Sequence, residues 1–140
     1  MRSVTEDGEP LTDVDYESLL AFRTGLRKFL NWSEAKAREA GLTPGQHQLL
    51  LAVRGHPGDQ PPAVGDLAEY LLLRHHSTVE LIDRAEAAGL VQRMRDEDDG
   101  RIIRIRLTGE GQARLGKLAS AHLNELRRLA PVLDHLTVSP

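Results

Sequence analysis

Residues 88–111 read AGLVQRMRDEDDGRIIRIRLTGEG and carry the strongest β-hairpin signal in a chain that otherwise has the patterns of helices. In the second half, Ile103, Ile105 and Leu107 alternate with arginines, so a strand would place the apolar residues on one face and the arginines on the other. Between the halves, residues 96–100 offer turn chemistry, because an Asp-Gly pair tolerates positive φ. The stretch therefore predicts an antiparallel hairpin with a charged tip and an arginine face that points outward.

The segments before this hairpin have helical spacing. In residues 76–88, Thr78, Leu81, Ile82 and Ala85 recur at the spacing of one helix face, and Gly89 ends the run. Another helical segment lies just upstream, at residues 66–73. Two helices, a glycine, a strand, a charged turn and a second strand follow one another in the order of a winged helix-turn-helix.

The chain resembles the MarR family of bacterial transcriptional regulators. The resemblance rests on short pieces that occur in order and at the family's spacing, and extends more loosely over residues 16–136: Asp66-Leu67-Ala68, Asp83-Arg84, Gly89-Leu90-Val91, Asp99-x-Arg101 and Leu107-Thr108-x-x-Gly111. It implies a mainly α fold with a small β-hairpin wing, and a dimer in which the first and last helices of two protomers interlace. The family often has a bulky residue between Asp99 and Arg101, but this chain has Gly100.

Apolar periodicity predicts a long amphipathic helix over residues 16–40, ended by Gly41. Its stripe is too long for a small core to cover, so part of it should meet a partner chain. Thr43-Pro44-Gly45-Gln46 has the form of a capping box that starts a helix over residues 44–54, with Leu49, Leu50 and Val53 facing inward.

The segment that links these elements is harder to delimit. Residues 63–64 could pair with the wing as a short strand, followed by a helix that carries Leu67, Ala68, Leu71 and Leu72. The next helix starts either near Arg74 and His75, as the resemblance implies, or later, because residues 77–80 also have capping-box form. Thr108 is a plausible cap for the last helix, whose apolar line includes Leu115, Leu118 and Leu126 and which should break at Pro131.

Length and composition suit one domain over residues 1–140, which holds 40% hydrophobic residues. We expect a mobile tail at 1–13, a DNA-binding lobe at 42–108, and dimerisation helices at 14–41 and 109–137. Nothing has the form of a secretory signal or a membrane span, so a cytoplasmic protein is expected. The formal charge of −3 argues against binding nucleic acid through bulk basicity, although arginines cluster in residues 74–106 beside a matching set of carboxylates.

The resemblance assigns the DNA contacts to the second helix and the wing. The predicted DNA-binding residues are Arg74, His75, His76, Ser77, Val79, Glu80, Arg84, Arg93, Arg95, Asp99 and Arg101. The start of the helix would meet base edges in the major groove, where Glu80 could accept from cytosine but would also be repelled by phosphates. Arg101 resembles the family's wing arginine, which enters the minor groove. Asp99 would hold either Arg93 or Arg101 in a fixed fork.

Family members commonly carry a small, often aromatic, ligand between the dimer helices and the DNA-binding lobe. Tyr16, Phe22, Trp32 and His47 lie on segments that could line such a crevice, and they could equally be plain core residues. No cofactor or metal site is expected, because the histidines lack paired ligand spacing and the chain has no cysteine. Enzyme activity is not expected either, since phosphate-loop and nucleophile motifs are missing.

The resulting hypothesis is a homodimeric, sequence-specific regulator of transcription that binds a pseudo-palindromic double-stranded operator and acts as a ligand-responsive repressor. The alternative is a winged-helix module that dimerises or binds a protein and has lost DNA binding. The acidic balance of the chain and the position of Glu80 favour that alternative.

Overall fold

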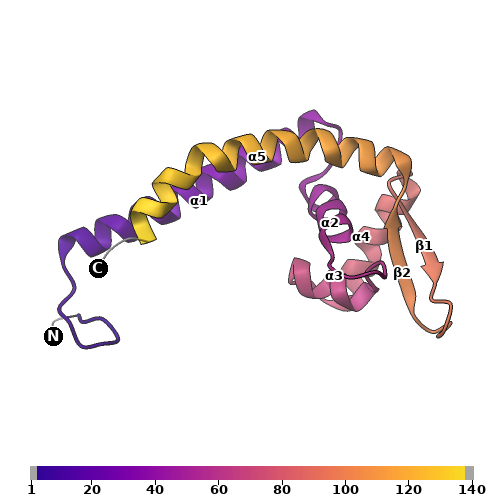
Figure 1. Cartoon of the computed structure of the whole chain (residues 1–140), viewed down its shortest axis with the longest axis horizontal. Helices are drawn as coiled ribbons and strands as arrows, with labels where there is room; N and C mark the ends of the chain where they lie inside the picture. The colour runs from indigo at the N-terminus through magenta and orange to yellow at the C-terminus, as the bar shows by residue number, and fades with distance from the viewer. Residues whose placement is uncertain (1–2, 138–140) are drawn as a thin grey trace. The chain divides into compact units, whose positions relative to one another are not determined.

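A computed structural model describes residues 3–137, with side chains up to residue 131. Within that range the elements, in chain order, are α1 (Asp13–Glu39), α2 (Pro44–Gly55), α3 (Val64–Leu71), α4 (His75–Ala87), β1 (Val91–Arg95), β2 (Ile103–Leu107) and α5 (Gly109–Thr137) (Figure 1). The predicted class, mainly α with a small β-hairpin wing, is confirmed. No helix of the described part of the chain is long and apolar enough to cross a bilayer.

The chain divides into two compact units. Unit 1 runs to Ser33 and resumes at His122, and unit 2 is Glu34–Ala121. In unit 1, α1 and α5 lie side by side in opposite directions (Figure 1), joined by a 2.7 Å hydrogen bond between Ser33 Oγ and His122 Nε2. Before α1, a short turn is bridged at Val4 and Pro10. The mobility of residues 1–13 stays a prediction.

Local chemistry ends α1 and starts α2 as predicted. Gly41 follows α1 with a φ of +78°, a left-handed conformation that glycine adopts without strain. Thr43 Oγ1 then accepts the N–H of Gln46 at 3.1 Å, and Gln46 Oε1 accepts the N–H of Thr43 at 3.0 Å. This reciprocal pair is the predicted capping box, with Pro44 at the first helical position.

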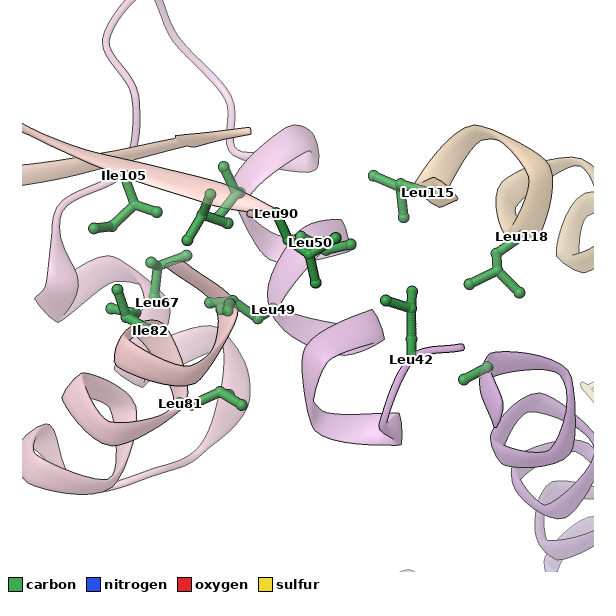
Figure 2. Packing of buried hydrophobic residues seen from close by; sticks show 14 residues of the cluster. Leu42, Leu49, Leu50, Leu67, Leu81, Ile82, Leu90, Ile105, Leu115 and Leu118 are labelled. Carbon is green, nitrogen blue, oxygen red and sulfur yellow. The ribbon is translucent and has the colours of Figure 1, made fainter. Parts of the chain in front are cut away.

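The core of unit 2 lies between the hairpin and α2–α4. Strands β1 and β2 pair in antiparallel register, with Arg93 opposite Ile105. Ile105 is fully buried, and Figure 2 shows it gathered with side chains from the helices around it. The inward sets predicted for α2 and α4 are buried: Leu49, Leu50, Val53, Thr78, Leu81, Ile82 and Ala85. The core thus fixes the hairpin and α4 in one unit.

The predicted apolar stripe of α3 is wrong at Leu72. The helix ends at Leu71, and Leu72 takes a left-handed conformation with φ +54° and a side chain that is 91% exposed. The N–H of Leu73 donates to the carbonyl of Ala68 at 3.0 Å, which satisfies an end carbonyl and turns the chain toward α4. The short strand predicted at residues 63–64 reduces to one bridge from Ala63 to Arg104, because Val64 already starts α3.

The predicted break at Pro131 is also wrong, because α5 continues through it to Thr137. A proline inside a helix removes one backbone donor and leaves the carbonyl four residues earlier without its partner. Pro131 is exposed, so water can bond the carbonyl of Arg127. One missing bond on the solvent side does not end a helix of 29 residues.

Leu72→Gly should leave the free energy of unfolding unchanged or raise it by up to about 1 kcal/mol, because a left-handed L residue is strained. Its exposed side chain contributes little that would be lost. The matched control is Leu73→Gly, whose φ is not positive and whose side chain is only 40% exposed. Urea denaturation at a fixed protein concentration should show that only the control is destabilised. Equal losses in both variants would contradict the strain at Leu72.

Candidate nucleic-acid interface

Helix α4 begins at His75, the earlier of the two predicted starts. Its N-cap is Arg74 in extended conformation, and both the N–H and the hydroxyl of Thr78 donate to the Arg74 carbonyl, at 3.0 and 2.9 Å. These bonds place residues 77–80 inside the helix, and Thr78 is fully buried in the core. The first turn of α4 therefore presents His75, His76 and Glu80 to solvent, while Ser77 and Val79 are half-buried.

The hairpin tip holds an arginine in a carboxylate fork. Asp99 Oδ1 and Oδ2 accept from Arg101 Nε and Nη2 at 3.1 and 3.2 Å, and Asp99 Oδ1 also accepts the Arg101 backbone N–H. Of the two predicted partners of Asp99, the structure has Arg101. These bonds lower the pKa of the Asp99 carboxyl. Because the Arg101 side chain is 91% exposed, the fork presents a cation of fixed direction at the end of the wing.

Arg93 is instead bound to α4. Its Nη2 lies 2.5 Å from Asp83 Oδ1 and its Nη1 lies 2.8 Å from Glu86 Oε1, while its backbone N–H donates to Glu86. Burial alone would lower the pKa of Arg93, but the bonds to Asp83 and Glu86 outweigh it and raise the pKa. This guanidinium joins the base of the wing to α4. Its use as a direct DNA contact stays a prediction.

A groove of about 460 Å³ separates the start of α4 from the wing. It brings together four of the predicted residues, His75 and Val79 from α4 and Arg93 and Arg101 from the hairpin. The rest of its lining comes from the start of α3, the start of β2 and the residue before each: Ala63, Val64, Gly65, Ile102 and Ile103. The other predicted residues lie on the same two elements outside the groove lining, and Arg74, Arg84 and Arg95 among them are exposed.

The prediction that the arginine face of β2 points outward is wrong for Arg104. Its side chain is only 19% exposed, with Nε 2.6 Å from Asp96 Oδ1 and Nη1 2.8 Å from the Pro61 carbonyl oxygen. The segment before α3 pairs along the edge of this strand, since Ile105 donates its N–H to the carbonyl of Pro62, and this places the Pro61 carbonyl within reach of the Arg104 guanidinium. Arg106, on the same face, remains exposed.

Sequence reasoning missed the role of Asp96. Its Oδ2 accepts the N–H groups of Asp98 and Asp99 at 3.1 and 3.0 Å, the pattern of an aspartate that opens a turn. The bond from Arg104, followed by these backbone bonds, lowers the pKa of the Asp96 carboxyl. An aspartate at the first position of the charged turn was the available signal, but its partner Arg104 could not be assigned from strand alternation.

The piece Leu107-Thr108-x-x-Gly111 connects the wing to α5. Thr108 Oγ1 donates to the carbonyl of Gly89 at 2.6 Å and accepts the N–H of Gly111 at 3.0 Å, so Thr108 caps α5 as predicted. The backbone N–H of Thr108 also donates to the carbonyl of Leu90 at 3.0 Å. A Cβ built on Gly111 would lie 2.1 Å from that carbonyl oxygen. Glycine is therefore required where α5 crosses the turn after α4.

The residues predicted to line an effector crevice are divided between the two units. In unit 1, Tyr16 and Phe22 are exposed, and Trp32 packs on His122 with ring centroids 4.8 Å apart. In unit 2, His47 is 4% exposed. Binding of an aromatic effector by these side chains stays a prediction. Among the side chains the structure describes, no group of three or more histidines and carboxylates is placed to hold a metal ion.

Comparison with known proteins agrees with this geometry. The profile of the MarR family matches residues 40–102, from the end of α1 to the wing tip. The structure of AbsC, a MarR family transcriptional regulator from Streptomyces coelicolor, superposes with a TM-score of 0.67 at 27% identity, over 92% of this chain and 98% of AbsC. Residues 40–102, a little under half of the chain, therefore resemble the MarR family.

Two further proteins extend the comparison. The transcriptional regulator PecS of Dickeya dadantii is 27% identical over 123 residues, which cover 85% of this chain and 74% of PecS. A mutant of S. aureus MepR, solved bound to an oligodeoxyribonucleotide, superposes with a TM-score of 0.66 at 21% identity, over 80% of each chain. The chain thus has a winged-helix fold and is similar to transcriptional regulators, and its match to MepR concerns the fold alone.

Proposed function

We propose that this chain is a MarR-family regulator that binds double-stranded DNA sequence-specifically as a homodimer, on a pseudo-palindromic operator, and acts as a ligand-responsive repressor in the cytoplasm. In this proposal α4 enters the major groove and the wing tip reaches the adjacent minor groove. The observation that carries it is the Asp99–Arg101 fork, an aimed cation beside the exposed first turn of α4 in the same unit. The oligonucleotide bound to MepR supports this use of the fold.

Two-fold binding requires a dimer, and α1 supports one. Its exposed large apolar residues are Val14, Tyr16, Leu19, Leu20, Phe22, Leu26 and Leu30, each more than 40% exposed. A soluble monomer rarely leaves a contiguous apolar surface of this kind uncovered. A second copy of the chain, with the same stripe on a two-fold axis, would cover it.

The alternative function is a winged-helix module that binds protein rather than DNA. Glu80 favours it, because this carboxylate is exposed on the first turns of α4, where it would repel phosphates. A salt titration of binding to random duplex DNA separates the two. Neutralising several phosphates gives a steep fall of affinity with salt, whereas a protein-binding module gives weak binding with no such slope.

Arg101→Ala should weaken operator binding by roughly 1–3 kcal/mol and reduce the slope of log affinity against log salt by about one unit, because it removes one minor-groove cation. Ser77→Ala is the matched comparison on α4. It should narrow the discrimination between operator and mutated half-sites while the salt slope stays nearly constant, because it removes a base contact rather than a charge. Fluorescence anisotropy over a salt series on an operator selected from random duplexes measures both quantities.

Asp99→Ala sharpens this test through the sign of its effect. If Asp99 aims Arg101, its loss should weaken binding as Arg101→Ala does, although it removes a negative charge close to DNA. Bulk electrostatics alone gives the opposite result. Tighter binding by Asp99→Ala would therefore show that the tip is not an aimed wing.

A further inference from the structure

A continuous path of hydrogen bonds runs from the segment before α3 to the exposed wing arginine. The Pro61 carbonyl accepts from Arg104, and Arg104 donates to Asp96. Asp96 in turn accepts the backbone N–H of Asp99, whose carboxylate holds Arg101. The path thus leads from the covered side chains of Arg104 and Asp96 to the exposed side chain of Arg101 at the tip.

The Asp96–Arg104 pair at the middle of this path differs from the fork at its end. Its two side chains are 11% and 19% exposed, compared with 91% for Arg101. Both oxygens of the Asp96 carboxylate are used, Oδ1 by Arg104 and Oδ2 by the backbone N–H groups of Asp98 and Asp99. A covered ion pair with its carboxylate oxygens satisfied acts as a rigid connection more than as a source of stability.

The Asp96–Arg104 pair also ties the wing to the segment just before α3, part of which lines the groove. Arg104 pairs with Ala63 in a β-bridge, and Ala63 and Val64 line the same groove as Arg101. Through its bonds to the Pro61 carbonyl and to Asp96, the guanidinium of Arg104 joins that segment to the turn that precedes Arg101. The Asp96–Arg104 pair therefore sets where the wing arginine stands relative to α3 and α4.

We propose that Asp96 and Arg104 are positioning residues for DNA binding, which hold the wing tip in place for Arg101 and raise operator affinity without touching DNA. This inference rests on the proposed function. It gives different roles to the two arginines that follow the turn. Arg101 acts on DNA, and Arg104 acts through Arg101. The sequence pattern alone predicts an exposed side chain for both arginines and does not distinguish these roles.

The test uses Arg104→Met, which keeps an apolar stem and removes the guanidinium, and Arg106→Met as the matched control on the same strand face. Arg104→Met should weaken operator binding about five- to tenfold, a usual size for coupling between connected groups. The salt slope should not change, because no phosphate contact is lost. Arg106→Met, which also removes one positive charge, should change affinity by less than about twofold.

A double-mutant cycle then asks whether Arg104 acts through Arg101. In an Arg101→Ala background, Arg104→Met should have an effect below about twofold, because the group that it positions is gone. A fall of about one unit in the salt slope of Arg104→Met, or full additivity with Arg101→Ala, would show a direct phosphate contact and overturn the inference. Wild-type affinity in Arg104→Met would overturn it as well.

Hydrogen exchange of the free protein gives a readout that needs no DNA. The backbone amides of residues 96–102 should exchange faster in Arg104→Met than in the wild type, and unchanged rates in Arg106→Met would locate the effect. Arg104→Met could fail to fold because it leaves the Asp96 carboxylate unpaired. In that case the double variant Asp96→Asn/Arg104→Met, which removes both charges, is used in the same measurements. Absence of salt-dependent DNA binding in the wild type would overturn the proposed function and this inference together, whereas wild-type binding with an unaffected variant overturns this inference alone.

Discussion

Gly111→Ala is expected to lower the free energy of unfolding by about 4 kcal/mol or more, a loss reserved for severe steric or polar defects. The added Cβ would lie 2.1 Å from the carbonyl oxygen of Leu90, and real Cβ atoms do not approach a backbone atom so closely. Leu90 cannot retreat easily, because its side chain is 1% exposed in the core and its carbonyl accepts the N–H of Thr108. A loss of this size approaches the whole stability of a small domain.

Gly116→Ala is the matched control, with the same change on the same helix. A Cβ at Gly116 meets nothing within 4 Å, so alanine should stabilise α5 by about 0.5–1 kcal/mol through its better helix propensity. Thermal and urea unfolding should therefore move in opposite directions for the two variants. If Gly111→Ala melted within a degree of the wild type, the close crossing of α5 over Leu90 would not exist as described.

The parts of the fold that sequence predicted best are those whose causes are local. Thr43 and Gln46 cap each other across three residues, and Gly41 and Gly89 end helices in left-handed conformations that other residues resist. The alternation that placed Ile105 in the core depends only on strand geometry. The caps and helix ends form without a distant segment, and strand alternation alone was enough to choose the face of Ile105.

At the candidate site, sequence failed where a side chain pairs with a residue on another segment. The Arg104 side chain is largely covered because residues 61–63, about forty positions earlier, pair with β2 and offer its guanidinium the Pro61 carbonyl, and strand alternation carries no information about such a partner. The choice between Arg93 and Arg101 as the partner of Asp99 depended on Asp83 and Glu86, which take Arg93 to α4. Element positions of the site residues were therefore predictable, and their pairings were not.

The start of α4 shows a third kind of limit, a competition between two adequate signals. Residues 77–80 have the form of a capping box, but Thr78 donates its hydroxyl to the carbonyl of Arg74 and is buried. Burial of Thr78 in the core favours the earlier start, which adds His75 and His76 to the exposed first turn. Tertiary packing, which the local pattern does not encode, made the choice.

Leu126→Glu is expected to convert a dimer into a monomer or an unfolded chain, and to abolish operator binding, because the proposed dimer needs the apolar faces of α1 and α5. Leu126 is 44% exposed and Leu123 is 51% exposed in the single chain, so neither side chain is buried by its own protomer. Burying an unpaired carboxylate in an apolar interface should weaken dimerisation by about a hundredfold or more.

Asn124→Glu introduces the same side chain at an exposed polar position of α5 and serves as the control. Sedimentation at micromolar concentration should show a dimer for the wild type and for Asn124→Glu, and should show no dimer for Leu126→Glu. Loss of operator binding should follow the loss of the dimer, because one half-site alone supplies only part of the contacts. A folded wild-type monomer at that concentration, or a Leu126→Glu dimer of unchanged affinity, would place the dimer interface elsewhere or remove it, and two-fold operator recognition through α1 and α5 would then be wrong.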